Sequence, residues 1–120
     1  RAKKIMSEII SENYHKTSAT IDFGDGGYPP MTLTEGNKKL LGHFSSVSID
    51  LGYGPVEAVN PRKAGAADIS FVSDFVKMSM DAIGLPGADG HTVKETGNIN
   101  YLSREAKRSA VLIYRLTRGN

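Results

Sequence analysis

The stretch LSREAKRSAVLIYRLT (Leu102–Thr117) carries the clearest secondary-structure signal in the chain. Apolar residues recur there at the spacing of one helix face: Leu102, Ala106, Ala110, Ile113 and Leu116. Arg118 follows at the end where the helix dipole favours a cation, and Gly119 comes next, where glycine often ends a helix. We therefore expect a long amphipathic helix in this part of the chain.

A strand pattern and a glycine-rich loop precede that helix. Residues 76–81 (VKMSMD) alternate between apolar and polar side chains, which is typical of a strand with one face in solvent. The loop GLPGADGHTVKE (Gly84–Glu95) follows, and glycine at this density lets a backbone approach another group closely. We expect a strand that leads into this loop, with the long helix after it.

Helices and strands also alternate nearer the N-terminus. Thr34 is a typical N-cap for a helix that Gly52 ends. Strands are expected at residues 17–23 and 55–59, and residues 69–75 fit either a short helix or a strand. Because helices and strands are interspersed along the chain, the pattern predicts an α/β or α+β fold.

The composition excludes several classes of protein. A length of 120 residues corresponds to one ordinary domain, and a net charge of +2 is too small to point to a nucleic-acid partner. The chain has no cysteine, which excludes a disulfide framework, a thiolate metal site and a cysteine nucleophile. No apolar run approaches the roughly 20 residues that a membrane-spanning helix needs. We expect neither a nucleic acid nor a membrane as a partner.

The first helix pattern begins without a cap. The chain opens RAKKIMSEIISENY, with arginine rather than methionine at position 1, and Arg1, Lys3 and Lys4 fall in the first turn, where the helix dipole disfavours cations. No Ser, Thr, Asp or Asn stands before this turn as an N-cap. We therefore expect a piece of a longer protein, although a trimmed domain with a frayed first turn fits the same pattern.

The histidines are the candidate metal ligands and proton carriers. His15 and His43 lie at or within expected helices, where a structural histidine is the ordinary interpretation. His91 lies in the glycine-rich loop, near Asp89 and Glu95, and a neutral imidazole oriented by a carboxylate is a common zinc ligand. Zinc needs three or four ligands, so the others would come from elsewhere. A proton carrier and a surface residue without a role stay open as alternatives.

Three segments resemble the C-terminal end of the dizinc carboxypeptidase and aminoacylase family, which includes glutamate carboxypeptidase and succinyl-diaminopimelate desuccinylase. They are GAADISFV (65–72), AIGLPGADGHTVKE (82–95) and LSREAKRSAVLIYRL (102–116), and the resemblance covers the whole chain in order. It implies an α/β fold. Residues 1–31 would be the last helix and strand of a lid and dimerisation domain. Residues 32–120 would be the C-terminal part of a zinc-binding catalytic domain, in which helices flank a sheet.

The same resemblance implies roles for individual residues. His91 would ligate one of two zinc ions, and Gly65 and Ala66 would line the substrate pocket. The implied reaction is hydrolysis of a peptide or N-acyl amide bond, which releases an amino acid, by a water whose pKa zinc lowers. In the family, the other zinc ligands and the general-base glutamate lie upstream. We therefore expect no catalytic residue in this chain and no activity from the chain alone.

Departures from the family narrow the expected substrate and leave alternatives. Tyr28 stands where some carboxypeptidases carry an arginine that binds a substrate carboxylate, which argues against a glutamate-type substrate, and Ala67 replaces a family threonine. The expected partner is a second copy or another chain. The alternative function is a non-enzymatic dimerisation or binding module, in which residues 1–23 pair with a second copy. A relative that keeps the fold without its upstream ligands is a third possibility.

Overall fold

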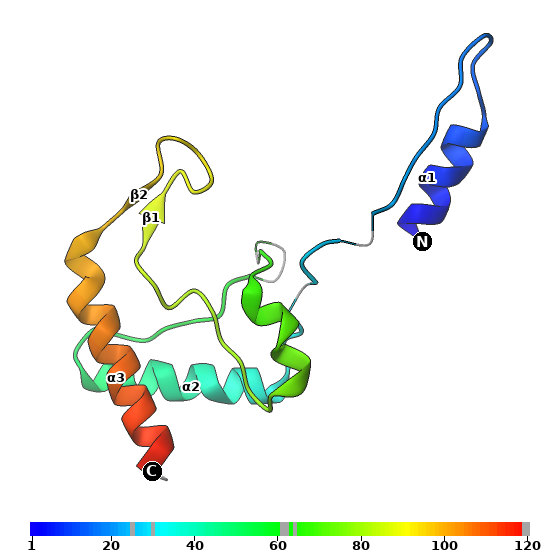
Figure 1. Cartoon of the computed structure of the whole chain (residues 1–120). Helices are drawn as coiled ribbons and strands as arrows, with labels where there is room; N and C mark the ends of the chain where they lie inside the picture. Colours follow the sequence, from blue (N-terminus) through cyan, green and yellow to red (C-terminus); the bar gives the residue numbers. More distant parts are fainter. Residues whose placement is uncertain (25, 30, 61–62, 64, 119–120) are drawn as a thin grey trace.

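The chain is largely helical in the part that the computed structural model describes, which is residues 1–24, 26–29, 31–60, 63 and 65–118. Within these residues the elements occur in a simple order along the chain: α1 (Ala2–Ser11), α2 (Glu35–Asp50), the 3₁₀ helices η2 (Asp68–Phe71) and η3 (Ser73–Phe75), β1 (Gly87–Ala88), β2 (Thr96–Gly97), the 3₁₀ helix η4 (Ile99–Tyr101) and α3 (Leu102–Arg118). Figure 1 shows α1 standing apart from the other elements at the end of an extended segment. None of the described helices is both long and apolar enough to cross a lipid bilayer.

The core lies where α2 and α3 cross. Phe44 and Val47 of α2 pack against Leu112 of α3, and these are the buried hydrophobic residues of the described chain. Partly buried residues surround them: Leu40, Leu51, Val56, Met80, Ile83 and Val111. The side chain of Thr34 caps α2 as predicted, by accepting a hydrogen bond from the backbone N–H of Asn37 at 3.1 Å. Gly52 follows α2 with a φ of 78°, a left-handed conformation that glycine adopts without strain.

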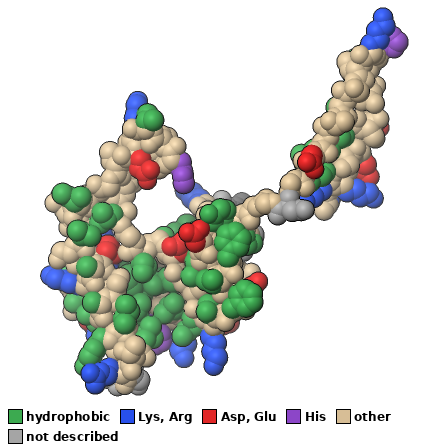
Figure 2. All heavy atoms as spheres, viewed as in Figure 1, with side chains coloured by type: hydrophobic (Ala, Val, Ile, Leu, Met, Phe, Trp, Pro, Cys, Tyr) green, Lys and Arg blue, Asp and Glu red, His purple; other side chains and the backbone are tan. Residues whose placement is uncertain are grey.

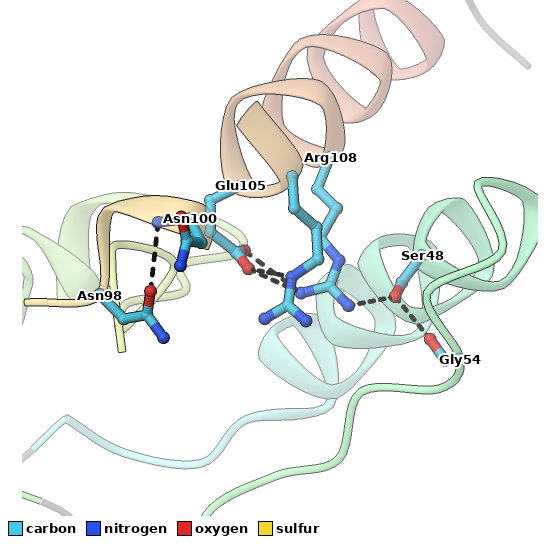
Figure 3. Close-up of polar contacts among 7 residues, drawn as sticks. Ser48, Gly54, Asn98, Asn100, Glu105 and Arg108 are labelled. Carbon is cyan, nitrogen blue, oxygen red and sulfur yellow. Dashed lines mark hydrogen bonds and ion pairs between the residues drawn. The ribbon is translucent and has the colours of Figure 1, made fainter. Parts of the chain in front are cut away.

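Buried polar contacts reinforce this crossing (Figure 3). Arg108 of α3 is 7% exposed and donates one guanidinium N–H to the Ser48 hydroxyl on α2 at 2.6 Å. A second N–H of Arg108 donates to both carboxylate oxygens of Glu105, at 3.0 and 3.2 Å. Arg104 also donates to Glu105, at 2.8 Å, and its guanidinium lies 3.9 Å from the centre of the Tyr101 ring. The two helices are therefore joined by charge-assisted hydrogen bonds as well as by apolar contact.

The apolar face of α3 is not the face that packs on α2. The predicted helix is confirmed, since α3 covers Leu102–Arg118. Gly119, the expected stop, lies outside the described residues. The face toward α2 carries Glu105, Arg108 and Leu112, whereas Leu102 and Ile113 of the apolar stripe are 60% and 61% exposed. An apolar stripe along α3 is thus left in solvent.

The strands predicted at 17–23, 55–59 and 76–81 are wrong, because none of these segments pairs with another strand. Side chains of α2 instead form hydrogen bonds with the backbone of two of these segments. The Ser45 hydroxyl accepts from the N–H of Val56 at 2.9 Å. The Asn37 side-chain oxygen accepts from the N–H of Ser79 at 2.7 Å. Residues 17–23 run back along α1, where the ammonium of Lys3 lies 5.4 Å from the ring centre of Phe23. Alternation predicts an extended backbone, but a strand also needs a partner.

Residues 69–75 take the helical alternative, as η2 and η3. The sheet of the described chain is the antiparallel pair β1–β2, in which Gly87 faces Gly97 and Ala88 faces Thr96. One small hairpin beside helices is compatible with several fold classes, so the α/β class remains a prediction.

Candidate functional site

The candidate metal ligand, His91, lies in the loop between β1 and β2. The two short strands approach closely because Gly87 has no side chain, and a Cβ there would collide with the carbonyl oxygen of Thr96. Beyond the strands, Asn98 donates its backbone N–H to the carbonyl of Pro86 at 2.9 Å. Backbone contacts therefore hold the two ends of the loop together at the base of the hairpin.

Thr92 organises the loop tip through short-range hydrogen bonds. Its hydroxyl donates to the carbonyl of Asp89 at 2.7 Å, and its backbone N–H donates to the same oxygen at 3.2 Å. The N–H of Glu95 donates to the Thr92 carbonyl at 3.1 Å, and the N–H of Lys94 donates to the Thr92 hydroxyl at 3.1 Å. A loop tied in this way holds its backbone in one shape although its residues are exposed.

His91 itself adopts a left-handed backbone with a φ of 64°, and Asp89 has a φ of 56°. Such a conformation costs a non-glycine residue roughly 1–2 kcal/mol, and residues of this kind gather at ligand-binding sites. The imidazole is exposed and forms no hydrogen bond or ion pair within the described chain. Both ring nitrogens are therefore free to bind an external group.

The described residues do not complete a metal site around His91. They contain no group of three or more His, Cys, Asp or Glu side chains placed to hold a metal ion. The acidic neighbours expected from the sequence, Asp89 and Glu95, are exposed like His91. This chain thus supplies one candidate ligand, and a complete site requires donors from outside the described residues.

The segment predicted to contact substrate, Gly65 and Ala66, lies exposed just before η2. Ser70 stabilises the turn at residues 67–70 through two hydrogen bonds. Its N–H donates to the carbonyl of Ala67 at 2.9 Å, and its hydroxyl accepts from the N–H of Ala67 at 3.5 Å. Ser70 is only 6% exposed. A Cβ at Gly65 would meet nothing within 4 Å, so the backbone there borders open space.

The structure brings Tyr28, which the resemblance placed at a substrate-binding position, to this segment, and its contacts with Asp68 and Phe71 were not predicted from the sequence. The Tyr28 ring meets the Phe71 ring edge-on, with centroids 5.1 Å apart. Its hydroxyl donates a hydrogen bond to the Asp68 carboxylate, and this contact and the negative charge of Asp68 raise the pKa of Tyr28 above its ordinary value. Asp68 and Phe71 are three residues apart, a spacing that places side chains together in a 3₁₀ helix. The sequence signal for the contact between Asp68 and Phe71 was this three-residue spacing, and it applies only when residues 69–75 are helical.

The loop of His91 and the segment around Gly65 are not in contact. No hydrogen bond, ion pair or ring contact joins residues 89–95 to residues 65–71 within the described chain. Figure 1 shows the β1–β2 hairpin and η2 on the same side of α2. The two candidate segments therefore form no common site within the described residues.

The remaining histidines differ from His91 in setting. His43 of α2 borders a shallow hollow between α2 and α3, which Ser46, Leu112, Arg115 and Leu116 also line. Arg115 is already paired with Asp50 of α2 at 2.7 Å. His15 lies in the exposed turn after α1. His15 lies next to Lys16, whose φ of 60° is also left-handed, but neither His15 nor His43 has a left-handed backbone itself.

Comparisons with known proteins return no match, whether with family models, with curated proteins or with solved structures. The functional argument therefore depends on the residues and the geometry described above.

Proposed function

We propose that this chain is part of a zinc-dependent hydrolase that cleaves a peptide or N-acyl amide bond and releases an amino acid. The observation that carries the proposal is His91, an exposed imidazole without a partner on a pinned hairpin loop with a left-handed backbone. A residue held in a strained conformation by its surroundings is typical of a binding site. In this proposal His91 contributes one neutral nitrogen to one of two zinc ions.

The rest of the site is proposed to come from elsewhere in a longer protein. The described residues offer no ligand cluster, so the remaining zinc ligands and the general base belong to an upstream part. When bound, the zinc ions would lower the pKa of a water and polarise the amide carbonyl. Gly65 and Ala66 would let the substrate approach the backbone before η2, because no side chain of Gly65 blocks it. The chain alone is expected to be inactive.

Metal content tests this proposal in the longer protein. His91→Ala is expected to remove one of two bound zinc ions, because that ion loses one of its three or four protein ligands. Zinc is measured by elemental analysis after dialysis. His43→Ala is the matched control, since His43 is exposed on α2 and is expected to leave the zinc content unchanged. Equal zinc content in both variants, or a protein without zinc, would contradict the proposal.

A second candidate function, a self-association module, is favoured by α1. No residue of α1 is buried, and its apolar residues Ile5, Met6 and Ile9 are 44%, 46% and 66% exposed. The backbone of residues 17–23 beside it is extended and pairs with no strand among the residues that the structure describes. An uncovered helix stripe and an unpaired extended segment are both surfaces that a second copy can cover. Sedimentation tests this candidate, because a monomer at every concentration would contradict it.

A further inference from the structure

Two aromatic rings and a carboxylate form an exposed shelf at the start of η2. The rings of Tyr28 and Phe71 meet at an interplanar angle of 63°, and these residues are 57% and 52% exposed. Figure 2 shows hydrophobic and acidic side chains together on the surface in the region of η2 and η3. We call Tyr28, Asp68 and Phe71 the aromatic shelf.

Asp68 gives the aromatic shelf its charge. The residue is exposed, and within the described chain its carboxylate pairs with no Lys, Arg or His. Its known partner is the neutral hydroxyl of Tyr28. A carboxylate has more acceptor positions than one hydroxyl can fill. The aromatic shelf therefore presents an uncompensated negative charge beside two ring systems.

This combination favours one class of ligand. Aromatic rings attract ammonium and guanidinium groups through their negative faces, and a neighbouring carboxylate strengthens that attraction. The same carboxylate repels an anion. We propose that the aromatic shelf binds the cationic group of a small organic molecule, namely the basic side chain of a peptide or N-acyl amino acid. This inference rests on the proposed function, since it names the class of substrate that would lie beside Gly65 and Ala66.

Ligand titration of the chain, followed by NMR of its aromatic signals, tests the aromatic shelf without any metal. The probes are N-acetyl-L-arginine amide, a cation, and N-acetyl-L-glutamate, an anion. The cation is expected to shift the ring signals of Tyr28 and Phe71, and the anion is not. Asp68→Asn keeps the size and a hydrogen-bond acceptor but removes the charge. It is expected to weaken cation binding about two- to fivefold, the upper part of the range for an exposed pair of opposite charges.

Asp81→Asn is the matched control, because Asp81 is an exposed carboxylate with no aromatic residue within five positions of it in the sequence. Its affinity for the cation is expected to stay unchanged, whereas Phe71→Leu, which keeps an apolar side chain, is expected to weaken binding as Asp68→Asn does. Equal binding of both probes, or equal affinities of Asp68→Asn and Asp81→Asn, would overturn the inference.

The outcome is separable from that of the metal test. If His91→Ala loses zinc but the aromatic shelf does not bind the cation, the proposed hydrolase function is supported and the proposed substrate class is wrong. If the aromatic shelf binds the cation but the longer protein holds no zinc, the cation site stands and the hydrolase is wrong.

Discussion

At the scale of single residues, Arg108 joins the two helices that form the core of the described chain. It is nearly buried, and its guanidinium bridges Glu105 on its own helix to Ser48 on α2. Phe44 and Tyr53 also lie beside it, with ring centres 5.8 and 5.4 Å from the guanidinium. A buried ion pair is costly to break from one side, and without Arg108 the buried Glu105 would keep only Arg104, whose side chain is 29% exposed.

We therefore expect Arg108→Met to lower the free energy of unfolding by about 3 kcal/mol, since Glu105 stays buried after the change. Arg104→Met is the control: its side chain is 29% exposed, and Glu105 keeps Arg108 as a partner. That variant is expected to lose under about 1 kcal/mol. Urea unfolding followed by circular dichroism measures both. Equal losses would show that the Arg108 bridge adds nothing beyond an ordinary surface pair.

At the scale of elements, local signals predicted the helices and failed for the strands. The cap at Thr34 and the apolar spacing from Leu102 onward are properties of neighbouring residues, and both helices form where these signals place them. The alternation in residues 76–81 is equally clear, but this segment crosses the first turn of α2. There Gly36 is needed because a Cβ would collide with the carbonyl oxygen of Lys77. Such a contact between distant segments leaves no trace in local periodicity.

The Thr34 cap can be tested by its loss. Thr34→Ala removes the acceptor for the N–H of Asn37 and is expected to cost about 1 kcal/mol of unfolding free energy. Thr117→Ala is the matched control, because the Thr117 hydroxyl donates to carbonyls already within α3, at 2.9 and 3.1 Å. It is expected to change stability by less than about 0.5 kcal/mol. The midpoint temperature of thermal unfolding is measured for both variants. Equal midpoints would show that the Thr34 cap does not stabilise the chain.

At the scale of the whole molecule, the chain is extended for its length. Its radius of gyration is 20.4 Å, whereas a compact domain of this size has about 14 Å. Two apolar stripes remain in solvent, one on α1 and one on α3. The composition predicted a chain that can form an apolar core. Residue spacing does not reveal which apolar faces are buried in that core and which remain exposed. The resemblance singled out His91 as a metal ligand, and this stays a prediction because the described residues contain no further ligands grouped around it.

The charges of α1 predict how a second copy would cover its stripe. Lys4 and Glu8 lie one turn apart on either side of Met6, with 3.7 Å between ammonium and carboxylate. An antiparallel copy centred on Met6 places each Lys4 opposite the partner's Glu8 and also opposes the two helix dipoles. A parallel copy would place like charges together, so the charge pattern favours antiparallel pairing.

Sedimentation velocity over a range of concentrations tests this pairing. Ile9→Lys puts a charge into the exposed stripe and is expected to weaken self-association at least about tenfold, the equivalent of about 1.4 kcal/mol. Val59→Lys, at a residue 60% exposed outside the helices, is the control and should associate like the parent. Lys4→Glu should also weaken association, because it faces Glu8 of the other copy, and adding Glu8→Lys should restore it. If the double variant stays as weak as Lys4→Glu, the antiparallel arrangement is wrong even where α1 still mediates the contact.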